Sequence, residues 1–235
     1  MEQLKLIIKA FRAVDDLESC QRYIEGHQKV LKIYGIDMIT SAKAAWLNDP
    51  NTYIILAESE NAEKTFGGAR IQVAAGTLPL PIEDALTKFD PNIHEFVSEL
   101  IPGGTGELCG LWNSREVAGL GIGSIYLGRT GVALAMQLNL NTLFALCAPA
   151  TVRNTMRVGF SVDERLGDKG AFFYPKEGLV ATAVLLKDVL TLSTADDEER
   201  RMIFELRSFP VQKKIDIGTK ERDLEVNYNL LIKSL

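Results

Sequence analysis

The chain has 235 residues, a formal net charge of −5 and 46% hydrophobic residues. The length fits one large domain, or one domain with additions, and the hydrophobic content is enough for a full core, which excludes a disordered chain. A negative net charge provides no basic field for nucleic acid. We therefore expect no nucleic-acid partner, and a local site for any anionic ligand.

The cysteines and the first residues of the sequence indicate whether a metal site, a disulfide framework or a secretory signal is to be expected. Cys20, Cys109 and Cys147 are far apart and lack CxxC spacing, which argues against a disulfide framework or a metal site and favours buried free thiols. The first residues carry an acid and no long apolar core, and no run approaches the roughly 18 apolar residues of a membrane span. We expect a cytoplasmic protein with no membrane span and no metal.

The N-terminal part predicts a strand and a helix. Residues 4–11 form an apolar run that is typical of a strand, and Asp15 and Asp16 then offer a helix N-cap. Apolar side chains follow at helical spacing as far as the natural stop at Gly35: Leu17, Cys20, Ile24, His27, Leu31 and Tyr34. Because His27 lies on this stripe, we expect it to be a core histidine.

A short helix and a hairpin are expected next. The helix covers residues 41–47 and ends before Asp49-Pro50. Residues 53–58 and 66–74 are two strand-like runs separated by a polar turn, which predicts an antiparallel hairpin.

Residues 76–104 read as an insertion. Two short amphipathic pieces, 82–89 and 93–101, stand between segments that contain proline and glycine. We interpret them as a pair of inserted helices, and we expect His94 within them to be exposed.

The second half predicts alternating strands and helices. Strands are expected at 106–112, 142–148, 160–162 and 179–187, and helices at 124–138, at 150–158 and from 194 to Pro210. The run 142–148 is continuously apolar, which suggests burial on both faces. The tail offers a hairpin from 214–217 and 224–228. The simplest organisation is one α+β domain over 1–190, with the insertion 76–104, and a C-terminal helix and tail, 191–235, packed on it.

A glycine-rich turn, Ala118 to Ser124, joins a predicted strand to a predicted helix. Three glycines at alternate positions allow a ligand to approach the backbone, and the first turn of a helix presents N–H groups that bind phosphate. From 117 to 162 the sequence contains no acid, and it contains Arg129, Arg153 and Arg157. The turn therefore indicates a phosphate-containing ligand, although a tight connection without a ligand is the alternative.

Two familiar nucleotide motifs do not fit this turn. A dinucleotide site needs GxGxxG and an acid about 20 residues later, whereas Ser124 takes the place of the third glycine and no acid follows in that window. A Walker loop, GxxxxGK[ST], is absent. Both nucleotide interpretations are weakened.

The segment from Glu107 to Ser124 resembles the acyl-CoA motif of the GNAT superfamily of N-acyltransferases, in which a strand leads into a [QR]xxGx[GA] turn and a helix. Residues 143–148 and 151–160 resemble the next strand and helix of that family. More loosely, the chain resembles its acyl-homoserine-lactone and N-acyl amino acid synthase branch. The resemblance implies an α+β fold with a mixed, mostly antiparallel central sheet flanked by helices, a helical insertion and a C-terminal addition.

The resemblance also implies roles for particular residues. Glu107 and Asn113 would be catalytic, with Glu107 as the general base and a backbone N–H near Trp112 polarising the thioester carbonyl. The donor would be held by Leu111, Trp112, Gly119, Leu120, Gly121, Ile122, Gly123, Ser124 and Arg129. Two positions depart from the family pattern: Ala118 replaces the motif Arg or Gln, and Thr155 replaces the tyrosine that protonates the leaving thiolate.

The function expected on this basis is transfer of an acetyl or other acyl group from acyl-CoA, a co-substrate, to a small-molecule amine. Two alternatives remain open. One is a long-chain N-acyl amino acid or acyl-homoserine-lactone type synthase that uses acyl carrier protein as donor, for which the apolar insertion would suit a lipid chain. The other is a catalytically degenerate GNAT-like ligand-binding protein, motivated by Thr155 and Ala118. A homodimer is also open.

Overall fold

The computed structural model describes residues 4–36, 39–74, 78–115, 124–217 and 223–232. Within these residues ten strands form one sheet: β1 (Leu4–Arg12), β2 (Thr52–Glu58), β3 (Thr65–Val73), β4 (Thr105–Asn113), β5 (Thr142–Cys147), β6 (Ser161–Val162), β7 (Ala171–Phe173), β8 (Val180–Leu186), β9 (Val211–Ile217) and β10 (Asp223–Asn229). Six α-helices flank it: α1 (Leu17–Ile33), α2 (Pro81–Leu86), α3 (Ile93–Leu100), α4 (Ser124–Ala135), α5 (Pro149–Arg157) and α6 (Asp197–Ser208).

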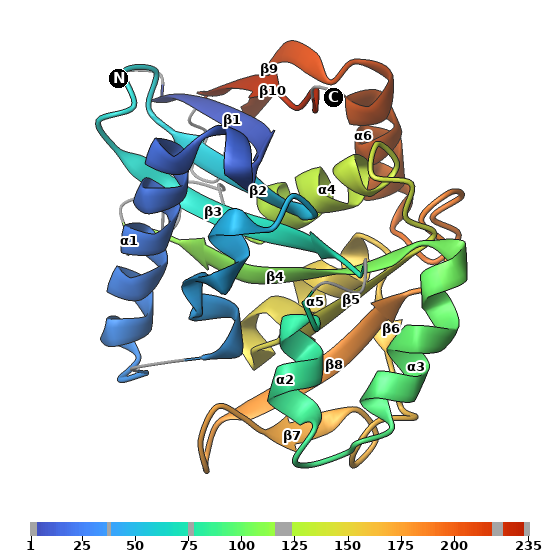
Figure 1. Ribbon diagram of the computed structural model, residues 1–235. Coiled ribbons are helices and arrows are strands. Elements are labelled where there is room, and N and C mark those ends of the chain that lie inside the picture. Colours follow the sequence, from blue (N-terminus) through green and yellow to red (C-terminus); the bar gives the residue numbers. More distant parts are fainter. Residues whose placement is uncertain (1–3, 37–38, 75–77, 116–123, 218–222, 233–235) are drawn as a thin grey trace.

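The sheet has the order β6-β8-β5-β4-β3-β2-β1-β10-β9, with β7 also paired to β8 (Figure 1). Only β4–β5 and β1–β10 are parallel among the described strand pairs; the other pairs are antiparallel. The predicted α+β class with a mixed, mostly antiparallel sheet is confirmed. The short strand β7 was not predicted.

The first helix forms as its sequence predicts. The Asp16 carboxylate accepts a hydrogen bond from the Ser19 N–H at 2.9 Å and caps the helix, and Gly35 follows its end with φ +62°. The buried stripe of α1 includes Tyr23 and His27, and it packs on β3 and β4. His27 is 4% exposed, so the expected core histidine is confirmed.

The short helix expected over 41–47 is wrong in type. The segment contains two 3-10 turns instead, η2 (Thr40–Ala42) and η3 (Ala44–Asn48), separated by Lys43 in an extended conformation. Neither turn has a side-chain cap, and the segment is too short to sustain a helix without one. The segment lies against the face of the sheet that α1 covers (Figure 1).

The inserted helix pair is confirmed as α2 and α3. Their apolar faces close over one face of β5 and β8 in a cluster that includes Leu80, Leu86, Val97, Phe144 and Leu185. The opposite face of the sheet packs against α4 in the largest core cluster. Strand β5 is therefore covered on both faces, as its apolar run predicted.

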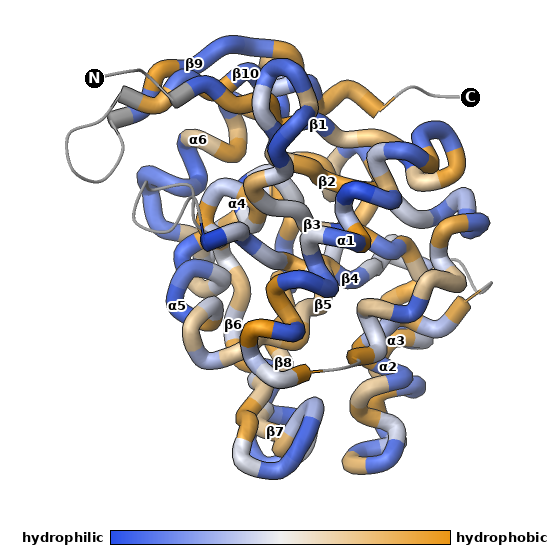
Figure 2. Tube along the Cα trace, turned by 90° about the vertical axis from the view of Figure 1, so that its left-hand side faces the viewer, coloured by the Kyte–Doolittle hydropathy of each residue, from blue (hydrophilic) through white to orange (hydrophobic). Residues whose placement is uncertain are grey.

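The C-terminal hairpin is also confirmed, and it has a place that the sequence did not predict. Strand β10 lies parallel to β1 and extends the same sheet, with Leu6 opposite Val226. Figure 2 shows β9 and β10 at one end of the molecule and β7 at the other. Helix α6 packs on α4, which ties residues after 190 to the core. The division into 1–190 and 191–235 stays a prediction.

The state of the cysteines agrees with the prediction from their spacing. Cys20, Cys109 and Cys147 are buried and free, as expected. In the part of the chain that the structure describes, no helix is both long and apolar enough to cross a bilayer.

A buried ion pair joins α4 to α6, and from it we predict an effect on stability. Glu199 is 1% exposed and binds Arg129 through two hydrogen bonds of 2.8 and 3.2 Å. E199A leaves the buried guanidinium without its carboxylate, so we expect the free energy of unfolding to fall by about 3–5 kcal/mol in urea titrations. D197A, which breaks an exposed pair with Arg200 on the same helix, is the control and should change it little.

Candidate functional site

The central feature of the site is a gap between β4 and β5. The two parallel strands pair only from Thr105 to Glu107 on β4 and from Thr142 to Phe144 on β5. Strand β4 then continues to Asn113, and β5 to Cys147, without pairing to each other. Backbone groups beyond this point have no strand partner on that side, and an extended ligand with amide groups can supply one.

A bulge in β4 accompanies the gap. Cys109 lies opposite Arg70 and Trp112 opposite Gly68, so Gly110 and Leu111 together face a single residue of β3. Gly110 has φ +55°, and its carbonyl accepts a 2.7 Å hydrogen bond from the Tyr23 hydroxyl of α1. A Cβ at this position would lie 2.2 Å from that hydroxyl oxygen. Both the backbone conformation and the close approach require glycine here.

Glu107 lies where β4 and β5 separate. It is 2% exposed, and its Oε2 accepts a 2.6 Å hydrogen bond from the Ile82 N–H at the start of α2. Burial raises the pKa of Glu107 to about 8, with Glu83 and Asp84 adding to the rise, while the Ile82 N–H and Arg70 oppose it. The carboxyl group is therefore held in the range where a general base works at neutral pH.

The same strands fasten the insertion to the sheet. Besides the Glu107 contact, Gln72 Nε2 donates to the Pro79 carbonyl at 2.9 Å. Glu83 accepts from the Leu80 N–H at 2.7 Å and contacts His94 Nδ1 at 2.8 Å. The His94 side chain is 48% exposed, in keeping with the expectation of exposure. Two polar side chains of the sheet thus fix where α2 begins beside the gap.

The turn predicted to hold pyrophosphate lies outside the described residues. Gly119, Leu120, Gly121, Ile122 and Gly123 belong to it, and their role stays a prediction. Ser124 is described as the first residue of α4, and its Oγ accepts a 2.8 Å hydrogen bond from Asn154 Nδ2 of α5. This contact fastens α5 to the beginning of α4.

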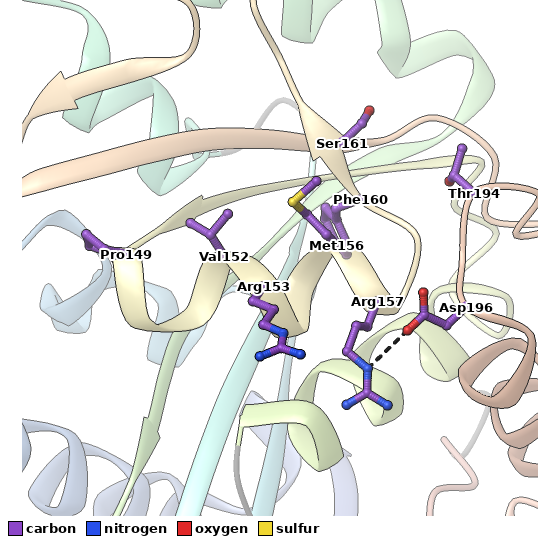
Figure 3. A pocket seen from close by; sticks show the side chains of 9 residues that line it. All are labelled: Pro149, Val152, Arg153, Met156, Arg157, Phe160, Ser161, Thr194 and Asp196. Atoms are coloured by element: carbon purple, nitrogen blue, oxygen red, sulfur yellow. Dashed lines mark hydrogen bonds and ion pairs between the residues drawn. The ribbon is translucent and has the colours of Figure 1, made fainter.

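A groove of about 670 Å³ runs along the outer side of α5. Figure 3 shows Arg153 and Arg157 projecting from one side of the helix. Arg157 is ion-paired with Asp196 at 3.1 Å and Glu199 at 2.9 Å. The exposed Arg153 makes no ion pair with the described residues. The apolar part of the lining includes Met156, which is 46% exposed, so the groove offers both charge and apolar surface.

Arg129 does not occupy the position expected for a donor ligand. It is 6% exposed, and its guanidinium lies over the Tyr126 ring and binds Glu199. A guanidinium fully engaged in a buried ion pair cannot also reach nucleotide phosphates at the surface. We correct the prediction: Arg129 holds α6 against α4, whereas the exposed Arg153 makes no ion pair with a described residue.

The end of β4 divides its side chains between the two faces of the sheet. The indole of Trp112 lies against Gly26 and Tyr23 of α1, and the part of this residue in holding the donor arm stays a prediction. Leu111 packs with the opposite, α4-side core. Because Ser114 N donates to Phe66 O of β3, the preceding N–H, that of Asn113, faces the gap.

Two polar atoms at this end of β4 lack partners. Asn113 Oδ1 and Ser114 Oγ are buried and make no hydrogen bond with the described residues. Such atoms are rare in native proteins and mark places where a ligand or water completes the pairing.

Thr155 makes local contacts only. Its Oγ1 donates to the Thr151 carbonyl at 3.0 Å and lies 3.4 Å from the Cys147 sulfur. Burial raises the pKa of Cys147 and keeps the thiol neutral. Neither group supplies a ready acid for a leaving thiolate. Across the described residues, no three His, Cys, Asp or Glu side chains gather to hold a metal ion.

Sequence reasoning missed one residue of the site, Arg70. It is 1% exposed on β3, opposite Cys109 and two residues from Gln72. Its Nη1 donates to the Ser41 carbonyl at 3.1 Å, and its guanidinium lies over the Trp46 ring at 4.9 Å. The available signal was two polar residues at alternate positions of an otherwise apolar strand, which marks one polar face.

Comparisons with solved structures identify the fold. FeeM, an N-acyl amino acid synthase from uncultured soil microbes, aligns with a TM-score of 0.58 at 15% identity, covering 81% of this chain and 95% of that one. The CoA-dependent acyl-homoserine lactone synthase BjaI, solved with SAM and isopentyl-CoA, gives 0.55 at 12% identity, covering 98% and 94%. An acyl-CoA N-acyltransferase from Pseudomonas aeruginosa gives 0.52 at 13%, covering 77% and 98%.

These proteins are N-acyltransferases, and the chain has the acyl-CoA N-acyltransferase-like fold that they share. Comparison of the sequence with protein-family models and with curated protein sequences finds no match. The fold is therefore identified by structural similarity alone. The sequence identities to these proteins are too low to identify the acyl donor or the acceptor.

The raised pKa of Glu107 predicts a pH-dependent stability difference. Between pH 4.5 and about 8 the unfolded chain loses this proton while the folded protein keeps it, so ionisation favours the unfolded state as pH rises. E107Q retains an oxygen for the Ile82 N–H and has no charge. We expect its stability relative to wild type to increase by on the order of 2 kcal/mol from pH 5 to pH 8 in urea titrations. A difference that is constant with pH would contradict the assignment.

Proposed function

We propose that this protein is an N-acyltransferase that moves an acyl group from a pantetheine thioester to an amine. The observation that carries the proposal is the gap between β4 and β5 with the buried Glu107 at its base. The fold shared with N-acyl amino acid, acyl-homoserine lactone and acyl-CoA N-acyltransferases supports it. The simplest donor is acetyl-CoA or another acyl-CoA.

In this proposal the donor arm lies in the gap as an extra strand. The N–H of Asn113 faces the gap and donates to the thioester carbonyl or to an amide of the arm, polarising or orienting it. Asn113 Oδ1 and Ser114 Oγ, which have no hydrogen-bond partner among the described residues, lie at the same end of β4 and would gain one from the bound donor. The turn before Ser124 and the start of α4 would take the pyrophosphate.

The chemistry needs a neutral amine and a proton acceptor. The amine nitrogen attacks the thioester carbon, its proton passes to Glu107, and the C–S bond breaks. Glu107 Oε2 is occupied by the Ile82 N–H, and Oε1, which has no hydrogen bond within the described residues, takes the proton. The thiolate takes its proton from solvent, since Thr155 is a poor acid.

A kinetic test follows from the role of Glu107. With saturating acyl-CoA and a panel of amines, we expect kcat to rise with pH towards about 8, and E107Q to lower kcat about 100-fold or more with donor affinity unchanged. E58Q, which alters a buried glutamate on β2 paired with Lys9 instead, is the matched control and should keep kcat.

Isothermal titration with acetyl-CoA and longer acyl-CoAs separates the outcomes. If no CoA thioester binds, CoA thioesters are excluded as the acyl donor. Binding without turnover over the amine panel would favour the degenerate ligand-binding alternative.

A second candidate donor is an acyl chain on acyl carrier protein. The α5 groove favours it, because the exposed Arg153, the partly exposed Arg157 and the apolar Met156 offer a surface for an acidic protein with an apolar contact. The apolar cluster of α2 and α3 lies beside the gap and suits a long chain. Structures of FeeM and of acyl-homoserine lactone synthases are among those with the same fold.

A charge reversal at Arg153 tests which of the two donors the protein uses. If the donor is acyl carrier protein, we expect R153E to raise KM for the carrier-linked thioester about tenfold at low salt and less at high salt. The same acyl group on free pantetheine should be used equally by both proteins. R200E, which reverses an exposed charge on α6, is the control. Equal KM values for wild type and R153E on the carrier would exclude this docking surface.

A further inference from the structure

Two buried carboxyl groups act on the start of α2. Glu107 of β4 accepts the Ile82 N–H at 2.6 Å, and Glu83, the next residue of α2, accepts the Leu80 N–H at 2.7 Å. Glu107 is 2% exposed and Glu83 is 9% exposed. Because the first N–H groups of a helix have no partner within the helix, these two carboxyl groups together fix where α2 begins.

His94 of α3 is joined to this arrangement through Glu83. Its Nδ1 lies 2.8 Å from Glu83 Oε1, and its Nε2 lies 2.9 Å from Thr87 Oγ1 at the end of α2. Helices α2 and α3 lie side by side (Figure 1), and the imidazole connects them through both of its nitrogens. The His94 side chain is 48% exposed, so it exchanges protons directly with solvent.

The hydrogen bonds of this group determine where its protons lie. Thr87 Oγ1 is 2.5 Å from the Glu83 carbonyl oxygen, a distance that requires the hydroxyl hydrogen between the two oxygens. The hydroxyl has no second hydrogen, so it accepts from His94 Nε2, and the ionised carboxylate of Glu83 can only accept from Nδ1. With all of these bonds made, the ring is an imidazolium, and its charge cancels that of Glu83.

The charge of Glu83 acts on Glu107. Burial is the main reason that the pKa of Glu107 rises to about 8, and the negative charges of Glu83 and Asp84 add to the rise. Asp84 has a lysine as its cation, since Lys43 Nζ lies 2.9 Å from its carboxylate. Glu83 is bound to a histidine, the type of side chain whose charge changes near neutral pH. The proton on His94 therefore decides whether Glu83 opposes the ionisation of Glu107 with its full charge.

The other groups that face Glu107 do not vary in this way. Arg70 of β3 favours the ionised form of Glu107. Cys109 of β4 and Cys147 of β5 also face it, but burial raises the pKa of both thiols and keeps them neutral. Among the described groups that act on Glu107, Glu83 is the one with a histidine partner.

We propose that His94 is a positioning residue that acts on Glu107 through Glu83: its imidazolium holds the first turn of α2 and cancels the neighbouring negative charge. As the pH rises and the imidazole loses its proton, Glu83 regains its full charge and Glu107 keeps its own proton to higher pH. The insertion thus links the protonation of an exposed histidine to that of the buried carboxyl group. The consequence for catalysis rests on the proposed function.

The test measures the ionisation of Glu107 without relying on activity. The free energy of unfolding is determined in urea from pH 5 to pH 9 for each protein and for the same protein carrying E107Q. The difference between the two levels off at the pH where Glu107 is ionised in the folded state. H94Q keeps a donor for Glu83 and carries no charge, so we expect it to move that pH upward by about half a pH unit or more. T87V removes the acceptor of Nε2 and should move it in the same direction.

E83Q should have the opposite effect. It keeps an oxygen for the Leu80 N–H and removes the negative charge, so we expect Glu107 to ionise at a pH lower by about half a pH unit or more. If His94 and Glu83 only held the helix, both variants would weaken the Ile82 contact, which favours the ionised form, and both would move the pH upward. An upward shift or no shift in E83Q, like no shift in H94Q, would overturn the inference. E99Q, on the exposed side of α3 and facing Arg165, is the matched control and should leave the pH unchanged.

The pH dependence of kcat for the same proteins separates this inference from the proposed function. If Glu107 is the base, the midpoint of the kcat profile moves with the ionisation of Glu107, upward in H94Q and downward in E83Q. If the ionisation moves and the kcat profile does not, Glu107 is not the base, and the link between His94 and Glu107 stands. If the ionisation does not move, the link is rejected whether or not the protein transfers acyl groups.

Discussion

The early end of hydrogen bonding between β4 and β5 is the constraint on which the rest of the site depends. Two parallel strands that separate inside a sheet leave backbone groups unpaired, and such groups are costly unless something else pairs them. The protein stabilises the separated strand from one side only. Strand β3 keeps its pairing through the bulge, and Tyr23 binds the carbonyl of Gly110. In the proposed function, the donor arm pairs with the other side.

The polar face of the sheet gives this gap its chemical character. Glu107, Gln72 and Arg70 are buried on one face, where apolar side chains would stabilise the fold more. The hydrogen bonds of Glu107 to Ile82 and of Gln72 to Pro79 offset part of the cost of burying these side chains, and they fix the start of the insertion. Arg70 donates to the Ser41 carbonyl and makes no ion pair with a carboxylate among the described residues. Local violations of good packing of this kind are expected at functional sites, where binding requires them.

The C-terminal addition positions the two helices beside the gap, α4 and α5. Glu199 on α6 binds Arg129 of α4 and Arg157 of α5, so one buried carboxylate sets the positions of the two helices that border the gap. Tyr126 in the first turns of α4 donates to Asp216 of β9. The last strands and helix therefore hold α4 and α5 in position beside the gap, and the exposed Arg153 of α5 makes no ion pair with the rest of the described chain.

Much of the fold could be predicted from the sequence because its signals are local. The capped stripe of α1, the proline-bounded insertion, the β2–β3 hairpin and the doubly buried β5 all follow from periodicity, turn residues and caps. The same reasoning placed Glu107 on a strand beside the expected donor motif, where the structure has it buried. The extended Lys43 that divides η2 from η3 carries no comparable signal, which is why a single helix was expected there.

The partners of charged residues were decided only by the tertiary structure. Arg129 follows the glycine turn in sequence, but Glu199, 70 residues away, neutralises it in the core. Trp112 lies on the strand that leads to the expected donor motif, yet the alternation of side chains along that strand directs its indole to α1. The contacts of Arg70 come from Ser41 of η2 and Trp46 of η3, both distant from it in sequence. Local sequence signals are enough to predict most of the elements and the glycine positions, because they depend on neighbouring residues. Which polar groups find a partner depends on packing between distant segments, and no local pattern encodes it.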